Sequence, residues 1–593
     1  MPGIAVIISR EPAEKCRARL DAMLSSMSHE SFYASASHDA PGLGIYAGAI
    51  TFENSTDGVF HDRDQDIALI FSGECFVGSE IATGPKLVEL YQRDGEKFVE
   101  KLNGLFSGLL IDSHRGRAIL FNDRYGIQRV YFHESKGEIY VASEAKALLR
   151  VLPELRQFNP EGVADYLTFG CTLDWKTLFR EIQILPGGSA WKFENGACRK
   201  TAYFAPQTWE SQPRLTAEAF EHRFQETFKR ILPRYFESTS RIGIALTGGL
   251  DTRMIMACRP VKNRTTCYTF SGNNGRTYDD KIAARVATAS GLDHQLLRLG
   301  PDFFSGFLSH ADKTVFVTDG CAGIFNSHEI YFNRQARELA VTRLTGNYGS
   351  EILRSVSTLK PVPLTRRLFN PELRATVESR TRDLSAHKEQ PLTFAAFKEI
   401  PWNLFGNLAA GRSQVHFRTP YLDNELVALA FQAPEQIRTS SLPSFRLVRD
   451  NSPSLSEIPT DRGYAGDNTG LGFWSRRFFA EATFKLDYYH NEGMPNSFAP
   501  FDPAIKQIGS CLGVLGRHKF LHYRSWFRNE LASYITDRLT GLQSRQNDFW
   551  DDSFVKTMAA DHISGRKNYS SEINTVLTLE SIERQLFHEL PRN

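Results

Sequence analysis

The chain has 593 residues, and its charges nearly cancel: 70 Lys plus Arg against 68 Asp plus Glu give a formal net charge of +2. This balance excludes the strongly basic surface of a typical nucleic-acid-binding protein. No apolar run reaches the 18 residues of a membrane-spanning helix, and a hydrophobic fraction of 41% is that of an ordinary globular chain.

The N-terminus and the cysteines indicate the compartment. Arg10, Glu11 and Glu14 interrupt the beginning of the chain too early for the apolar core of a signal peptide. The eight cysteines show no Cys-x-x-Cys pair and no regular spacing, so we expect mostly buried thiols in a reducing environment. A cytoplasmic location is therefore predicted, and the length allows two to four domains.

Residues 1–205 are predicted to form a layered α+β domain. Apolar runs bounded by Gly, Asp, Ser or Lys are typical of strands, whereas two later segments have helical periodicity. A polar stretch with two prolines at 206–213 is typical of a linker. The expected strands are 4–8, 67–71, 106–111 and 139–142, and the expected helical segments are 87–91 and 96–102.

Residues 206–593 are predicted to form an α/β domain with a mainly helical region from about residue 390. Thr216 can cap a helix in which Phe220, Phe224 and Phe228 recur four residues apart on one face. The segments that follow alternate strand and helix, an order that builds a parallel sheet with helices on its faces. They are strand 242–246, helix 252–258, strand 266–270, helix 280–290 and strand 295–299.

The loop after the first of these strands is typical of a phosphate-binding site. Gly248 and Gly249 let the backbone approach a phosphate closely, and the helix that follows offers free N–H groups. Thr247 and Thr252 supply hydroxyl donors, and Asp251 supplies a carboxylate for a magnesium ion. A sharp strand-to-helix turn with a capping residue is the alternative. No Walker A sequence occurs, so this is not a P-loop.

The chain resembles the asparagine synthetase family over nearly its whole length. Residues 246–252, Leu-Thr-Gly-Gly-Leu-Asp-Thr, resemble the family's pyrophosphate loop, and residues 344–351 and 417–423 resemble two later motifs. Segments 103–112, 122–126 and 142–146 resemble the family's N-terminal domain. The resemblance implies an N-terminal Ntn-hydrolase-like αββα sandwich in residues 1–205. It implies an α/β ATP-pyrophosphatase domain, of the adenine nucleotide α-hydrolase-like type, with a helical C-terminal region in residues 206–593.

The resemblance also implies the cofactors, ATP and Mg²⁺, and the residues that bind them. Backbone groups at Leu246, Phe270 and Gly346 are expected to hold the nucleotide. Asp251 and Glu351 are expected to hold magnesium, although the family has Asp where this chain has Glu351. The longer Glu side chain would shift the ion or require a compensating backbone change. A helix first-turn acid is the alternative role for Glu351.

Three further residues are candidates for catalytic roles. Tyr348 stands where asparagine synthetases commonly have Glu and β-lactam synthetase has Tyr, so a general base and a structural Tyr are both open. Glu399 is a candidate partner for that tyrosine. Arg462 falls where the family places a Lys that stabilises developing phosphate charge, and a surface Arg is its alternative role.

The residues expected for glutamine hydrolysis have changed. The family's chain normally opens Met-Cys-Gly-Ile, and the Cys releases ammonia from glutamine; here position 2 is Pro2. The family's Arg-Gly-Pro-Asp segment is absent near residues 40–44, and its Asn-Gly-Glu reads Ser72-Gly73-Glu74. A different translation start is the alternative, but no Met-Cys pair occurs in the chain. We expect no glutaminase activity.

These features together predict an AMP-forming carbon–nitrogen ligase that takes its amine from elsewhere, as β-lactam synthetases and lasso-peptide cyclases do. Its substrates are expected to be a small-molecule, peptide or glycan carboxylate and an amine, with no nucleic acid and no membrane span. Amidation with free ammonia, lasso-peptide cyclisation and a non-catalytic scaffold are the alternatives. A homodimer is left open.

Overall fold

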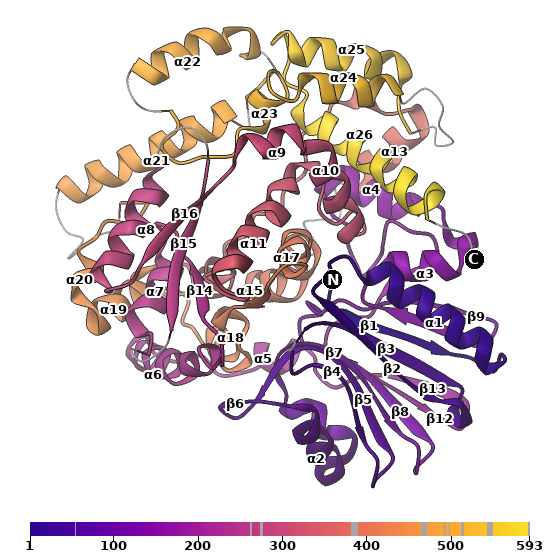
Figure 1. Ribbon diagram of the computed structural model, residues 1–593. Helices are drawn as coiled ribbons and strands as arrows, with labels where there is room; N and C mark the ends of the chain where they lie inside the picture. The colour runs from indigo at the N-terminus through magenta and orange to yellow at the C-terminus, as the bar shows by residue number, and fades with distance from the viewer. Residues whose placement is uncertain are drawn as a thin grey trace.

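The computed structural model is a mixed α/β molecule with two antiparallel sheets and one parallel sheet (Figure 1). The N-terminal part of the chain contributes both antiparallel sheets, and the parallel sheet follows it. The described residues are 1–53, 55–260, 264–272, 277–380, 390–463, 471–491, 494–496, 498–511, 515–541 and 549–590. Within α21 and α22, some side chains, including Cys511 and those of 471–477, lie outside this description.

The two antiparallel sheets contain all four strands expected in residues 1–205. The strand expected at 67–71 continues to Val77, because it pairs with β7 as far as Phe76 and with a short later strand at Phe76 and Val77. The first sheet has the order β11 (Gln183–Ile184), β9 (Tyr131–Ser135), β10 (Glu138–Ala142), β1 (Gly3–Ile8), β3 (Ile45–Phe52) and β2 (Tyr33–Ala40). The second has the order β13 (Ala197–Ala202), β12 (Ser189–Glu194), β8 (Arg117–Asn122), β7 (Asn103–Asp112), β5 (Ile67–Val77) and β4 (Gly58–Asp62), with β6 (Glu80–Ile81) beside β5.

Side-chain alternation builds an αββα arrangement from these sheets. Ile4 and Val6 of β1 join the apolar core between the sheets, whereas Ala5 and Ile7 join the core under the helices. Helices α1 (Ala13–Met27) and α3 (Ala145–Val151) cover the first sheet. The second is covered by α2 (Gly84–Asp94) and the 3₁₀ segment η2 (Gly95–Lys101), where helical periodicity is expected.

The chain then passes through α4 (Pro160–Phe169) to the expected linker, which contains the short helix α5 (Gln207–Glu210). Thr216 caps α6 (Ala217–Tyr235), as predicted, by accepting a hydrogen bond from the Ala219 N–H at 3.2 Å. Phe220, Phe224 and Phe228 are all buried along one side of this helix.

The parallel sheet has the order β16 (His294–Arg298), β15 (Thr265–Ser271), β14 (Ile242–Ala245), β17 (Thr342–Thr345) and β18 (His416–Arg418). The predicted strand-helix alternation is confirmed here, with boundaries within two residues of the expected ones. The intervening helices include α7 (Leu250–Cys258), α8 (Tyr278–Ala289) and α11 (Ser327–Leu339). The central strand, β14, lies between β15 and β17, so the loop after it emerges in the middle of the sheet's carboxyl edge.

Helices dominate the described residues beyond 390, as expected. A layer of them lies over the parallel sheet at the top of Figure 1. It includes α21 (Leu471–Asn491), α22 (Asp502–Cys511), α23 (Tyr523–Trp526), α24 (Ala532–Thr540), α25 (Asp552–Ile563) and α26 (Ser570–Ile582). Among the described residues, no helix combines the length and the hydropathy needed to cross a bilayer.

Buried charges join the two halves of the chain. Lys146 of α3 is fully buried and lies 2.9 Å from the carboxylate of Asp319, which follows α10 (Phe307–Val317). Arg234 of α6 pairs with Asp423, which also accepts a hydrogen bond from Asn103 of β7 at 3.1 Å. The halves are therefore held together by the buried Lys146–Asp319 ion pair and the Asn103–Asp423 hydrogen bond as well as by apolar packing.

Glu572 of α26 gives the fold a predictable pH dependence. It is 3% exposed, and burial raises its pKa from 4.5 to about 7. Between these values the folded state keeps a proton that the unfolded state has released. The free energy of unfolding therefore falls as pH rises from about 4.5 to about 7, by on the order of 3 kcal/mol.

The Glu572→Gln variant should lose this dependence, because Gln can still accept the Thr365 N–H hydrogen bond (3.0 Å) without ionising. We expect it to match the wild type near pH 4 and to exceed it in stability at pH 8, measured by urea unfolding. The exposed Glu154→Gln is the matched control. Parallel pH curves for the wild type and Glu572→Gln would contradict the assignment.

Candidate functional site

The loop between β14 and α7 is held by hydrogen bonds among its own residues, with Thr252 at the start of α7 and with Asp279 of α8. The hydroxyls of Thr247 and Thr252 lie 3.2 Å apart, and the Gly249 N–H donates to the Thr247 hydroxyl at 3.2 Å. The Gly248 N–H donates to a carboxylate oxygen of Asp279 at 2.9 Å. The two hydroxyls that the sequence assigns to phosphate binding therefore face one another across the loop.

A second glycine-containing loop, between β17 and α12 (Gly349–Arg354), packs directly on the first. A Cβ atom at Gly346 would lie 2.7 Å from the Thr252 backbone nitrogen, and one at Gly349 would lie 2.5 Å from the Asp251 carboxylate carbon. Only glycine permits this approach at either position. The structure thus brings together the two motifs that the sequence places about 100 residues apart.

Arg354, at the end of α12, holds the Asp251 carboxylate. Its Nη2 atom lies 2.7 Å from Oδ1 and 2.8 Å from Oδ2 of Asp251, and 2.7 Å from the Ser350 hydroxyl oxygen. Sequence reasoning missed this residue. The available signal was its place one helical turn after Ser350, on the face that meets the phosphate loop.

Asp251 and Glu351 line one cavity of about 310 Å³. Burial, and then the charge of Asp251, raise the pKa of Glu351 to about 7. Gly346 and Tyr348 line the same cavity, so it contains both expected metal ligands and two of the other candidate residues. Residues between positions 320 and 410 supply most of the remaining wall: Glu329, Arg343, Asn347, Ser350, Leu404, Asn407 and Leu408.

Two other charged residues support the phosphate loop and were also missed. Burial, and then the charge of Asp461, raise the pKa of Asp279 to about 6. Arg253 is 1% exposed, and its guanidinium donates to the carbonyls of Gly248 and Pro459 at 3.4 and 3.2 Å. Burial lowers the pKa of Arg253 to about 10. Both residues fix the loop's position through backbone groups.

The expected pairing of Tyr348 with Glu399 is not formed. Glu399 is fully buried and its Oε1 accepts hydrogen bonds from Thr358 and Leu359, whereas its Oε2 has no hydrogen-bond partner within the described part of the chain. Tyr348 has left-handed backbone angles, with φ of 73°. Burial raises the pKa of its hydroxyl, whereas a general base needs a lowered one. The structure therefore favours the structural alternative for Tyr348.

The remaining candidates take separate positions. Arg462 is 45% exposed and its guanidinium carbon lies 3.7 Å from the ring centre of Phe484, outside the cavity lining. Its neighbour Asp461 donates its backbone N–H to the Gly248 carbonyl at 3.1 Å, so the segment does touch the phosphate loop. Leu246 and Phe270 lie at the carboxyl ends of β14 and β15, where backbone contact with a nucleotide was expected.

The donor set fits Mg²⁺ and ATP with one condition. Mg²⁺ usually takes one or two protein carboxylates together with substrate phosphates, and Asp251 and Glu351 supply two in one cavity. The α7 N-terminus and the glycine loop suit a polyphosphate. Arg354 already bonds both oxygens of Asp251. The condition for metal binding is therefore that Arg354 shares or releases these oxygens.

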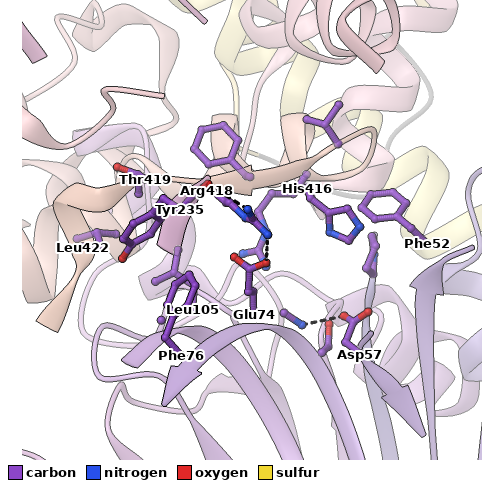
Figure 2. A pocket seen from close by; sticks show the side chains of 17 residues that line it. Phe52, Asp57, Glu74, Phe76, Leu105, Tyr235, His416, Arg418, Thr419 and Leu422 are labelled. Atoms are coloured by element: carbon purple, nitrogen blue, oxygen red, sulfur yellow. Dashed lines mark hydrogen bonds and ion pairs between the residues drawn. The ribbon is translucent and has the colours of Figure 1, made fainter. Parts of the chain in front are cut away.

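A second, smaller cavity of about 60 Å³ lies between the N-terminal sheets and β18 (Figure 2). Pro2, Ser72 and Gly73 line it from the N-terminal side, and Phe417 lines both this cavity and the one around Asp251. Figure 2 shows Glu74 and Arg418 pointing toward each other across it. Their carboxylate and guanidinium are 2.5 Å apart.

The charges of this interface cavity are largely satisfied by the protein itself. The Asp57 carboxylate accepts the Gly73 N–H at 2.9 Å, and burial raises the pKa of Asp57 to about 6. Burial, and then the charge of Arg418, lower the pKa of His416 to about 4. No described lining residue is a cysteine. Cys75, beside Glu74, is fully buried, and burial raises the pKa of its thiol.

Comparison with known proteins identifies one matching domain family and several partial relatives. Residues 60–204 match the glutamine amidotransferase domain family. Glutamine phosphoribosylpyrophosphate amidotransferase from B. subtilis covers 63% of this chain and 89% of its own, with 12% identity and a TM-score of 0.24, which is too low to support an argument.

Sequence relatives are named for amide chemistry. Asparagine synthetase [glutamine-hydrolyzing] 2 of Bacillus subtilis (strain 168) is 26% identical over 41% of this chain and 36% of its own length. Asparagine synthetase B of Escherichia coli (strain K12) is 24% identical over 29% and 26%, and amidase chyE of Penicillium rubens is 24% identical over 40% and 40%. The matches thus span about two fifths or less of these relatives. The chain is thus similar over part of its length to asparagine synthetases, and residues 60–204 are similar to glutamine amidotransferase domains.

Proposed function

We propose that the chain is an ATP-dependent, AMP-forming amide ligase. The observation that carries this proposal is the meeting of two glycine loops that places Asp251 and Glu351 on one cavity. Relatives named asparagine synthetase and amidase support amide chemistry in general. The adenylating step, the cofactors and the substrates are our inference.

In the proposed reaction a substrate carboxylate oxygen attacks the α-phosphorus of ATP. The bond between the α-phosphorus and the bridging oxygen breaks, pyrophosphate leaves, and an acyl-adenylate forms. Gly248, Gly249 and the hydroxyls of Thr247 and Thr252 hold the polyphosphate. Magnesium, when bound by Asp251 and Glu351, supplies positive charge beside the phosphate oxygens. An amine then attacks the acyl carbon, AMP leaves, and the amine's proton passes to solvent or a nearby base.

Arg354 has a clear place in this proposal. Its guanidinium lies against Asp251, so it is close to where the leaving pyrophosphate would develop charge. A fixed cation there would stabilise that charge throughout the reaction. Arg354 would also keep Asp251 in place until nucleotide arrives. Tyr348, with its raised pKa, is assigned to the cavity wall rather than to proton transfer.

The direct test is exchange of labelled pyrophosphate into ATP in the presence of candidate carboxylates: amino acids, uronic acids and peptide acids. Acid-dependent exchange with AMP as the final product supports the proposal. Release of ADP and phosphate would show a different activation chemistry. An absence of both ATP binding and exchange would refute the ligase.

A non-catalytic scaffold is the second candidate, and one observation favours it. The Gly248 N–H and the Asp251 carboxylate, which a ligand would use, both bond to protein side chains. If these bonds are permanent, ATP should not bind even with millimolar Mg²⁺. Calorimetric titration with ATP and Mg²⁺ separates the two candidates before any acid is known.

Glutamine is not expected to serve as the nitrogen source. The interface cavity has no cysteine among its described lining residues, and its acidic residue Glu74 is already paired with Arg418. The Ser72 hydroxyl accepts a hydrogen bond from Gln128 at 2.9 Å rather than meeting a base. Purified protein incubated with labelled glutamine should therefore release no glutamate above a protein-free blank. Sustained glutamate formation would overturn this expectation.

A further inference from the structure

The helices α21, α22, α23 and α25 belong to the C-terminal layer in the upper part of Figure 1. A third cavity, of about 500 Å³, opens between them. Its volume lies within the range of small-molecule sites. It shares no lining residue with the cavity around Asp251 or with the interface cavity. Neither the proposed ligase reaction nor the motifs in the sequence give it a role.

Positive charge is in excess on its wall. Arg524 and Arg528 both bond to the same carboxylate, Asp502, which is the only acidic residue among its described lining residues. Two guanidinium groups therefore share one negative charge. Arg566, at the rim, differs because Asp561 neutralises it at 2.8 Å.

Both shared guanidiniums are largely withdrawn from solvent. The Arg524 side chain is 2% exposed and that of Arg528 is 11% exposed. The Nε atoms of both are buried and have no hydrogen-bond partner among the residues that the structure describes. Burial, and then the charge of Arg524, lower the pKa of Arg528. Although burial opposes it, hydrogen bonds from His490 and Arg524 hold the pKa of Asp502 well below its usual range.

The rest of the wall is mixed. Asn529, Ser525 and Ser564 offer hydroxyl and amide groups, and Pro500 and Ile563 add a small apolar surface. Such a wall suits a compact hydroxylated molecule with one charged group rather than a long acyl chain. A bidentate oxyanion would balance the excess positive charge of the two guanidinium groups.

We propose that this cavity binds a small organic oxyanion of monosaccharide size, a phosphate monoester or a carboxylate, through Arg524 and Arg528. The site stands independently of the ligase proposal, because it uses none of the residues around Asp251. A sugar phosphate and a sugar acid share the recognised chemistry, and separate titrations distinguish them.

The test is calorimetric titration of the full chain with glucose 6-phosphate, glucuronate, inorganic phosphate and glucose. We expect saturable binding of at least one of the two charged sugars, and none of glucose. Arg528→Gln leaves Arg524 and Asp502 as a one-to-one pair and should weaken binding about tenfold to a hundredfold. Arg566→Gln, the matched control, should change it by less than about threefold.

Asp502→Asn should not lower the anion affinity as Arg528→Gln does. It removes the competing carboxylate, so anion binding should be retained or strengthened, whereas a purely structural role of the cluster predicts weakening. Thermal unfolding of each variant shows that it is folded at the titration temperature. Binding of neither charged sugar at 10 mM by the wild type would overturn the proposal, as would equal affinities of the wild type and Arg528→Gln.

Discussion

Replacing Asp251 by Asn is expected to reduce acid-dependent ATP–pyrophosphate exchange by about a hundredfold to a thousandfold. Asn keeps the size of the side chain but removes the charge that lies between Arg354 and the cavity. Binding of ATP with Mg²⁺ should weaken about tenfold or more, which calorimetry measures without knowledge of the acid.

Two further variants show which property of Asp251 matters. Asp279→Asn still accepts the Gly248 N–H, so its exchange should fall by less than about tenfold. Arg354→Gln frees Asp251 from its guanidinium partner. If Arg354 only occupies the metal position, this variant should bind Mg²⁺ with ATP more tightly; if it also stabilises pyrophosphate, exchange should fall. Unchanged exchange in Asp251→Asn would remove this carboxylate from the proposed mechanism.

The second large effect is on stability. Lys146→Met is expected to lower the free energy of unfolding by about 3 to 5 kcal/mol, because it leaves Glu144 and Asp319 buried without their shared cation. The direction of the Lys146 pKa agrees with a stabilising role for its charge. Burial lowers this pKa, but the charge of Asp319 outweighs burial and raises it above its usual value. The measurement is the shift in the urea midpoint and the melting temperature.

A surface pair provides the control for Lys146. Lys15 is 51% exposed and pairs with Glu11 one helical turn away, so Lys15→Met should cost about 1 kcal/mol or less. In the double variant Lys146→Met with Asp319→Asn, part of the lost stability should return. A loss below about 1 kcal/mol for Lys146→Met alone would show that these charges are solvated or compensated in another way.

The sequence predicts strand order and loop chemistry well where the signals are local. The alternation from β14 to β16 follows from short apolar runs separated by glycine and polar residues. The continuation of β5 from Ser72 to Val77 was missed because polar residues end its apolar run, whereas its pairing with β7 and β6 reveals it. β2, Tyr33–Ala40, was missed for a similar reason: its face is largely polar and exposed.

Charge pairing across long separations was the part that could not be predicted. Arg354 and Asp251 are 103 positions apart, and Gly248 and Asp279 are 31 apart, so no periodicity links them. Glu399 shows the opposite case, in which the sequence suggests a pairing that the structure does not form. Its chemistry suits a partner for Tyr348, but its oxygen accepts the N–H groups of the extended segment at Thr358 and Leu359 instead.

The ion pair between Glu74 and Arg418 also bears on how such a gene can change. Arg418 is 7% exposed, and its guanidinium also donates to the carbonyls of Tyr235 and Glu237. A deletion of the first 205 codons would leave this guanidinium, together with Asp319 and Asp423, without the charges and amides that now face them. The amino-terminal half thus supplies contacts that the second half needs for its own packing. Mutations that change the chemistry of the amino-terminal half should therefore be tolerated more readily than its deletion.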